Sequence, residues 1–248
     1  MYFFLTQLTT SDIIITSDTV PNMLLMVMNN GTTMSLVGCI TQLVCFLSSE
    51  CSECLFLTVM SYDRYLAICH PLHYHSIMNS NLCMKYILAS WLLSFTVTSF
   101  QTLNLSQLHF CRSNVIDHFF CDFDPVLKLS CSNVKKIKTL SLFIGFSLIV
   151  CPFFVIAISY VYIIHTILII QSITGRQKAF STCGSHLTVV TLFYGTLFSI
   201  YLIPEKENSI VLRKILSIVY TVVTPLANPI IYCLRNKDFK KAIKKLHF

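Results

Sequence analysis

Hydrophobic residues fall into six long runs along this 248-residue chain, separated by short polar segments. The runs suit a bilayer, because a membrane-spanning helix needs about 20 mostly apolar residues. A membrane-spanning β-strand needs only about 9–11 residues, so the lengths favour helices over a closed barrel. The predicted spans lie near residues 2–28, 37–68, 82–103, 137–170, 179–203 and 215–234.

The pattern predicts one all-α membrane domain over residues 1–248, built as a helical bundle. Three prolines, Pro152, Pro225 and Pro229, fall inside predicted spans. Proline removes a backbone donor and crowds the preceding turn, so we expect a kink near each of them.

The end of the chain, residues 238–248, predicts a short amphipathic helix. Phe239, Ile243 and Leu246 fall on one side, with lysines elsewhere. An apolar face with a basic surround favours the inner, anionic leaflet of a membrane.

Composition narrows the class of protein. Hydrophobic residues make up 54% of the chain and charged residues 12%, against about 25% charged in soluble domains. The net charge of +7 could suggest nucleic acid, but the basic residues are scattered at span ends and in the tail. We therefore expect the lipid bilayer as a partner and no nucleic acid. The excess of Lys and Arg places the Asp63 end of the second run, and the tail, in the cytosol.

Two features of the opposite side agree with this orientation. Asn30 and Asn104 each begin a glycosylation sequon, and both fall at the lumenal end of a run. Four of the twelve cysteines also fall there, where an oxidising compartment favours disulfides. Four cysteines allow three pairings, and their positions do not choose among them. The four are Cys39, Cys111, Cys121 and Cys131.

The second run closes with adjacent acid, base and phenol side chains, Asp63, Arg64 and Tyr65. Charges at the end of a membrane span are costly unless they pair or reach water. Asp63 can restrain Arg64, and Tyr65 can lie at the headgroup level. We interpret the cluster as a latch that either holds the bundle closed or opens toward a cytosolic partner.

Several segments together resemble olfactory receptors, a family of rhodopsin-like G-protein-coupled receptors. They occur in the order and at the spacing of that family. The matching segments are Met1–Leu5, Met60–Cys69, Val115–Asp122, Lys178–Leu187 and Pro225–Tyr232.

The resemblance implies a seven-helix fold, of which this chain would hold six, starting at the second. We therefore expect a rhodopsin-like bundle at the plasma membrane that binds an odorant and activates a stimulatory, olfactory-type G protein. The alternative is a truncated, non-signalling product that is retained or degraded, or that only associates with other receptors. Either way the expected protein is not an enzyme and carries no cofactor, with the exception of an internal sodium ion.

Other roles follow from the same resemblance. It implies the disulfides Cys39–Cys121 and Cys111–Cys131. It also implies that Arg64, once released from Asp63, contacts Tyr160, Tyr232 and the G protein.

Asp12 and Glu53 lie deep in apolar runs, where an unpaired charge is expensive. Two facing carboxylates need a counter-ion or a proton. The family resemblance implies a sodium site at these positions, with Asn228 completing a polar cavity. We favour a site for water and sodium, and the alternative is simple protonation with hydrogen bonds to neighbours.

Glu50 lies about midway between Cys39 and Arg64, on one helix face with Phe46 and Glu53. An acid at this depth could select a cationic amine. The alternative is a protonated acid bonded to a hydroxyl or a backbone carbonyl.

By position within matching spans, the resemblance implies an odorant site that is mostly apolar, as small-ligand sites usually are. For each residue the alternative is plain helix packing. Tyr194 matches the aromatic switch beneath the ligand. The predicted ligand-binding residues are Phe46, Leu47, Glu50, Cys51, Ile144, Leu148, Leu197, Phe198 and Tyr201.

Overall fold

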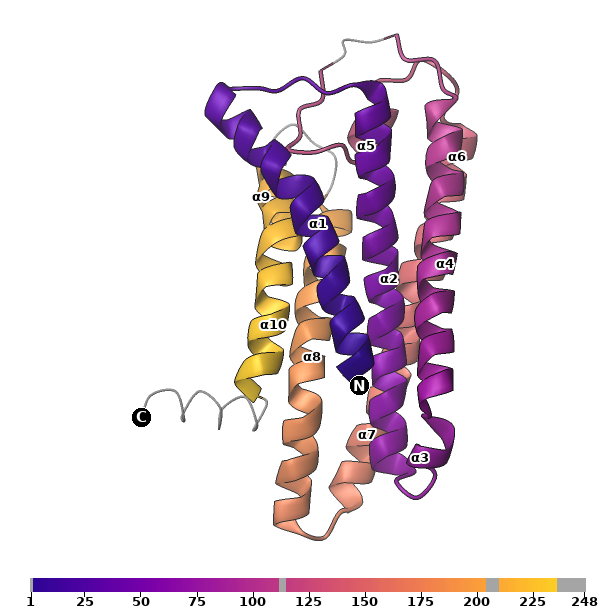
Figure 1. The fold of residues 1–248 in the computed structure, drawn as a ribbon, viewed down its shortest axis with the longest axis vertical. Helices are drawn as coiled ribbons and strands as arrows, with labels where there is room; N and C mark the ends of the chain where they lie inside the picture. Colours follow the sequence, from indigo (N-terminus) through magenta and orange to yellow (C-terminus); the bar gives the residue numbers. More distant parts are fainter. Residues whose placement is uncertain (1, 112–114, 204–209, 236–248) are drawn as a thin grey trace.

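The computed structural model describes residues 2–111, 115–203 and 210–235, and the elements in these ranges are helical (Figure 1). The short helices α3 and α5 lie in the connections, and η1 and η3 are five-residue π-helical turns. The elements are α1 (Tyr2–Asn29), α2 (Leu36–Cys69), α3 (Tyr74–Ile77), α4 (Ser80–Ser106), α5 (Phe123–Leu127), α6 (Lys135–Gly145), η1 (Phe146–Val150), α7 (Cys151–Ile169), α8 (Ile173–Leu202), α9 (Ile210–Ile218), η3 (Val219–Val223) and α10 (Thr224–Arg235).

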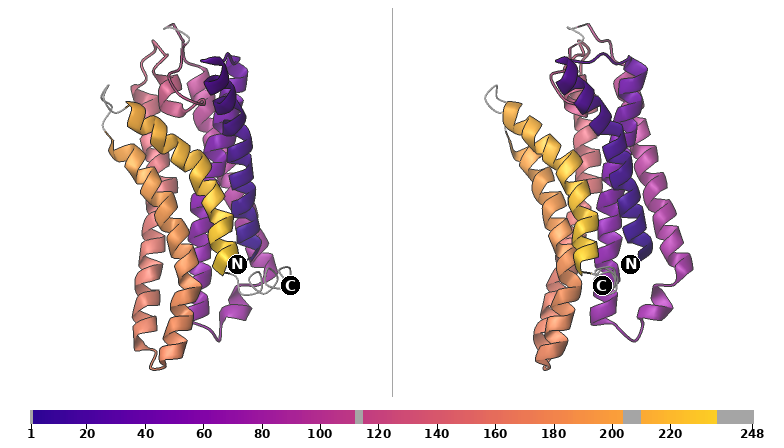
Figure 2. Two further views of the ribbon diagram at one scale, coloured as in Figure 1. Left: turned by 90° about the vertical axis from the view of Figure 1, so that its left-hand side faces the viewer. Right: turned by 60° about the vertical axis from the view of Figure 1, so that its left-hand side comes forward.

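The long helices run up and down beside one another as a bundle (Figures 1 and 2). Helix α2 has a central place, since it packs against α1, α4, α7 and α8. Helices α6 and α7 follow one another through η1 without a break, and α9 and α10 do the same through η3. The short helix α3 lies at the end where α2 terminates, and α5 lies at the opposite end (Figure 1).

A helix occupies each of the six predicted spans. Within the described residues, five helical segments are long and apolar enough to cross a membrane. They are 36–69, 80–106, 135–169, 173–200 and 211–232. The first predicted span differs: α1 is a 28-residue helix, but its composition alone does not mark it as a span. Its threonines and serines, with Asp12 and Asp18, lower its hydropathy.

Wide π-helical turns precede two of the three prolines that were expected to kink their helices. At the end of η1 the Cys151 N–H bonds to the Phe146 carbonyl, five residues back, just before Pro152. The Thr224 N–H bonds in the same way to Val219 at the end of η3, just before Pro225. Such turns are a known cause of helix bending. Pro229 lies inside α10.

The largest apolar cluster runs through the middle of the bundle, joining α1, α2, α7 and α8. A second cluster lies beneath the outer connection around Cys39 and Cys121, and a third joins the inner ends of α1, α2 and α4. Many large apolar side chains point outward instead, including Val155, Ile158 and Leu168 of α7. That outer surface suits lipid, since hydrocarbon solvates such side chains as well as a protein core does.

Candidate functional site

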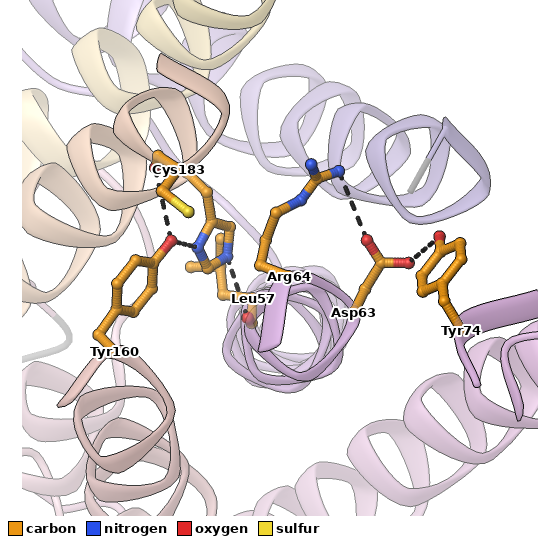
Figure 3. Close-up of polar contacts among 7 residues, drawn as sticks. Leu57, Asp63, Arg64, Tyr74, Tyr160 and Cys183 are labelled. Atoms are coloured by element: carbon orange, nitrogen blue, oxygen red, sulfur yellow. Dashed lines mark hydrogen bonds and ion pairs between the residues drawn. The ribbon is translucent and has the colours of Figure 1, made fainter. Parts of the chain in front are cut away.

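At the end of α2, Asp63 contacts partners from two directions (Figure 3). Its Oδ2 lies 3.4 Å from the Arg64 guanidinium, and its Oδ1 accepts a 2.9 Å hydrogen bond from the Tyr74 hydroxyl. Both Asp63 and Arg64 are buried. Burial first, and then the Asp63 carboxylate, raise the pKa of Tyr74 to about 12, so its hydroxyl keeps its proton at cellular pH. Tyr74 lies on α3, outside the segments singled out from the sequence.

On the other side of α2, a second group of contacts joins three helices (Figure 3). The Tyr160 hydroxyl of α7 lies 2.8 Å from Nδ1 of His186 on α8. Nε2 of the same ring lies 3.1 Å from the Leu57 carbonyl of α2. A carbonyl can only accept, so Nε2 carries the proton and Nδ1 accepts from Tyr160. The Tyr160 hydroxyl also lies 3.5 Å from the Cys183 carbonyl.

Arg64, which is paired with Asp63 in the first group of contacts, also acts on the second group. Its charge acts on Tyr160, on Tyr232 and on His186, although its ion pair is with Asp63. Tyr65 points elsewhere: its hydroxyl lies 3.1 Å from Nε2 of His70, and its ring contacts other aromatic rings. The structure therefore brings together four of the five residues expected to couple to a G protein. Tyr65 lies beside them, half-buried against α7.

Deeper in the bundle, Asp12, Glu53 and Asn228 meet as expected. The Asn228 amide donates to both Asp12 carboxylate oxygens, at 3.0 and 3.2 Å, and Glu53 interacts with Asp12. Each of the three residues is buried. Oε1 of Glu53, Oδ1 of Asn228 and the nearby Ser49 hydroxyl have no hydrogen-bond partner among the described residues. Buried oxygens with spare lone pairs are the donor set that a hard cation or water requires.

Glu50 is buried on α2 and faces two segments distant in sequence. Tyr220 of η3 and Asp122 of the outer connection both act on its carboxyl group. Phe46 lies one helical turn before Glu50, with its ring 4.9 Å from that of Phe120 and 6.0 Å from that of Tyr220. Glu50 therefore lies near aromatic rings, and among the described residues no basic side chain forms an ion pair with it.

The other predicted ligand residues divide into two sets. Phe46 and Leu197 belong to the central cluster, and Leu47 and Phe198 pack against it. Cys51 and Leu148 are buried outside that cluster, and Ile144 is half-buried. Tyr201 is in α8, but its side chain lies outside the described residues, as do all residues of the predicted helix 238–248.

Tyr194 is almost fully buried at the centre of the bundle. Its ring lies 5.1 Å from Phe153, 5.7 Å from Phe198 and 5.2 Å from Phe193. It thus links α7 and α8 between the outer and inner halves.

The outer end is held by two disulfides, the same pairs that the resemblance implies. Cys39 bonds to Cys121 and Cys111 to Cys131, with Cα–Cα distances of 5.4 and 5.9 Å. Next to the first, buried Gln42 joins three segments. It donates to the Asp18 carbonyl at 2.7 Å and accepts from the Cys121 N–H at 2.9 Å.

The outer connection also contacts α9. Asp117 forms an ion pair with Lys214, and His118 hydrogen-bonds Ser217 at 3.2 Å. Lys214 also lies over the Phe119 ring, 5.9 Å from its centroid. Burial lowers the pKa of His118, and Lys214 adds to this, while Asp122 and Asp117 oppose it.

The two sequons differ in structure. Asn30 is exposed between α1 and α2, in a left-handed conformation with φ 52°. Asn104 is half-buried in α4, and its side-chain amide donates to the Phe100 carbonyl at 2.7 Å. The geometry leaves Asn30 more accessible to a glycosyltransferase.

The sequence alone did not mark several residues of this network, above all Tyr74, Gln42, His186, Phe120 and Tyr220. His186 and Phe120 lie inside segments that carried the resemblance, so their motifs offered a signal. A buried polar residue in an apolar run, such as Gln42, offered another.

Membrane helices, a buried polar core and a charged cluster at one end define a membrane protein of the helical-bundle class. A family model described as "Olfactory receptor" matches residues 1–248. Olfactory receptor 6B2 of Homo sapiens is 44% identical over 245 residues, covering 99% of this chain and 78% of that receptor. Olfactory receptor 1500 of Rattus norvegicus is 46% identical over 243 residues, covering 98% and 78%.

The chain belongs to the olfactory receptor family of G-protein-coupled receptors. Like other members it is a multi-pass protein of the plasma membrane, and it is a receptor rather than an enzyme. Members of the family carry no resident cofactor.

Proposed function

We propose that the receptor binds a small, mostly apolar odorant, amines included, between the outer halves of its helices. The supporting observation is the central apolar cluster, which extends from Phe46 and Phe120 near the outer connection to Tyr160 and Cys183 near the inner end. A ligand that repacks the outer part of this cluster would therefore bias the inner part. The nine predicted ligand residues remain our candidates for the contact surface.

Tyr194 is the proposed switch within this cluster. Its ring contacts Phe153 and Phe198, and its buried hydroxyl interacts with the Cys54 thiol of α2. A thiol is a weak hydrogen-bond partner, so a small rotation that gives the hydroxyl a stronger one would favour a second packing. Ligand binding would shift the population between the two packings.

At the inner end, the receptor would activate a stimulatory, olfactory-type G protein and raise cyclic AMP. Opening the bundle would separate Arg64 from Asp63, and Arg64 already lies close to Tyr160 and Tyr232. Tyr65, half-buried at the same end of α2, would contact the G protein once the bundle opens.

Asp12, Glu53 and Asn228 would hold a sodium ion. The unpartnered oxygens of Glu53 and Asn228 fit this role, because sodium prefers oxygen ligands. When bound, the ion would supply a positive charge between the two carboxylates. The Asn228 amide orients Asp12 from the opposite side.

A cyclic-AMP assay across a panel of neutral and amine odorants tests the coupling. Cells would express the receptor with the stimulatory olfactory-type G protein, and surface labelling would normalise the amount of receptor. We expect an odorant response that Arg64→Ala abolishes and that Arg176→Ala keeps, since Arg176 instead bonds the Leu168 and Ile170 carbonyls at the end of α7. A surface-expressed receptor that leaves cyclic AMP unchanged with every odorant would contradict the proposal.

A further inference from the structure

Glu50 is a buried acid whose charged neighbours are also acids. Asp122 acts on it from the outer connection, and Glu50 in turn acts on Glu53, one helical turn along α2. Its relative exposure is 6%, and no ion pair of Glu50 occurs among the described residues. A carboxylate in such surroundings is unfavourable unless it takes up a proton or meets a cation. Tyr220 also acts on Glu50, but its hydroxyl supplies no positive charge to offset that of the carboxylate.

The walls near Glu50 are aromatic. Phe46 precedes Glu50 by one turn of the same helix, and its ring makes an edge contact with Tyr220 at 6.0 Å. Phe120 lies 4.9 Å from Phe46 on the outer side, and Phe193 lies 6.0 Å from Tyr220. These rings come from α2, the outer connection, η3 and α8, so the fold gathers them from distant parts of the sequence.

An acid with aromatic rings beside it is a chemical match for one kind of ligand. Aromatic ring faces attract cations, and a cation whose charge is spread over methyl groups gains most from them because it sheds little hydration. The carboxylate then completes the site as a counter-ion in a region of low dielectric.

We propose that the receptor prefers small N-methylated amines, bound as ammonium ions between Glu50 and the rings of Phe46, Phe120 and Tyr220. This inference rests on the proposed odorant-binding function and names the ligand class for it. Aliphatic amines are protonated at neutral pH, as lysine is. Asp122, in the outer connection, adds to the negative potential at Glu50.

Binding can be measured apart from signalling. The receptor, purified in lipid nanodiscs at pH 7.4, would be titrated with N,N-dimethylcyclohexylamine, cyclohexylamine and isopropylcyclohexane, and its thermal shift would give the dissociation constants. The three probes share a ring body and differ in charge and methylation. We expect the tertiary amine to bind about tenfold more tightly than the uncharged isostere, with the primary amine between them.

Two variants separate the two parts of the site. Glu50→Gln keeps the shape of the side chain and should remove the advantage of both amines over isopropylcyclohexane. Phe46→Leu keeps apolar bulk without a ring and should reduce the advantage of the tertiary amine over the primary amine. Asp124→Asn, at an exposed acid on α5, is the matched control and should leave the order of affinities intact.

The outcomes distinguish this inference from the proposed function. Equal binding of all three probes, or amine selectivity that survives in Glu50→Gln, overturns the inference even if neutral odorants still raise cyclic AMP. If Glu50→Gln fails to fold, the order of affinities of the three probes in the wild type and in Phe46→Leu tests the inference instead. Tight binding of the tertiary amine without any cyclic-AMP response would support the amine site and contradict the signalling proposal.

Discussion

The Tyr160 hydroxyl donates a 2.8 Å hydrogen bond to Nδ1 of His186, and the two rings stack with their planes 11° apart. Because Nε2 of the same imidazole bonds the Leu57 carbonyl, one side chain ties α2, α7 and α8 together near their inner ends. Relative movement of these helices must break at least one of these contacts.

Tyr160→Phe should destabilise the receptor by about 1–3 kcal/mol, since it leaves a buried imidazole nitrogen without its donor. The measurement is the melting temperature of the receptor in detergent. Tyr162→Phe is the control, because Tyr162 lies on the same helix but is 58% exposed. Equal melting temperatures for the two variants would show that the Tyr160 bond contributes nothing.

Tyr74→Phe should raise signalling in the absence of ligand. The change removes the hydroxyl that holds the Asp63 carboxylate at 2.9 Å, so Asp63 restrains Arg64 less well. Loss of about 1 kcal/mol from the closed packing would raise the open population roughly fivefold. Basal cyclic AMP per surface receptor is the measurement.

The control is Tyr62→Phe, since Tyr62 precedes Asp63 in sequence but its ring stacks on Tyr65 at 6.3 Å. A rise of the same size in this variant would point to a general loss of packing rather than to the Asp63 contact.

The sequence predicted the position of each long helix well and its ends less well. Hydropathy reports where a helix leaves the membrane, not where it stops, so the span expected from residue 179 begins at Ile173. The added residues 173–178 are stabilised by polar contacts. The Ser172 hydroxyl accepts from the Gly175 N–H, and Arg176 bonds the Leu168 and Ile170 carbonyls. Such contacts leave no trace in a pattern of apolar residues.

Contacts within one segment, such as that of Asp63 with Arg64, could be predicted because the residues are adjacent. Contacts between segments could not, since they depend on how each helix is rotated about its axis. Phe120 and Tyr220 illustrate this, since they lie 74 and 174 residues after Phe46 in sequence, yet both rings contact its ring. The resemblance to a family supplied pairs of residues distant in sequence that the hydrophobic pattern left open, including both disulfides.

Sodium should stabilise the receptor specifically. If Asp12 and Glu53 hold the ion, added sodium chloride raises the melting temperature more than potassium chloride at the same ionic strength, which controls for screening. At a concentration ten times its dissociation constant, the ion adds about 1.4 kcal/mol. Asp12→Asn should remove the difference between the salts.

Asp18→Asn is the matched control, because Asp18 lies on the same helix nearer its outer end. A sodium effect that persists in Asp12→Asn, or one that potassium reproduces in the wild type, would exclude these carboxylates as the site.

Gln42→Ala should weaken the outer end of the bundle although the neighbouring disulfide remains. The substitution leaves the Cys121 N–H without its acceptor and removes a donor from the Asp18 carbonyl, at a cost of about 1–3 kcal/mol. We expect a lower melting temperature than for Gln107→Ala, since Gln107 is exposed at the end of α4. Limited proteolysis of the outer connection provides a second readout, and unchanged cleavage would contradict the prediction.

Acid should destabilise the contact between the outer connection and α9 through His118. Burial lowers the pKa of this imidazole below its ordinary value of 6.5, so the unfolded chain binds a proton at a higher pH than the folded chain does. Between the two pKa values the free energy of unfolding therefore rises with pH, by up to about 1.4 kcal/mol per pH unit, and falls on acidification.

We expect the melting temperature to drop from pH 7 toward pH 5, and to drop less in His118→Gln, which can still bond Ser217. His109→Gln, at an exposed ring of the same connection, should behave as the wild type. If His118→Gln retains the full acid sensitivity, His118 is not the titrating group.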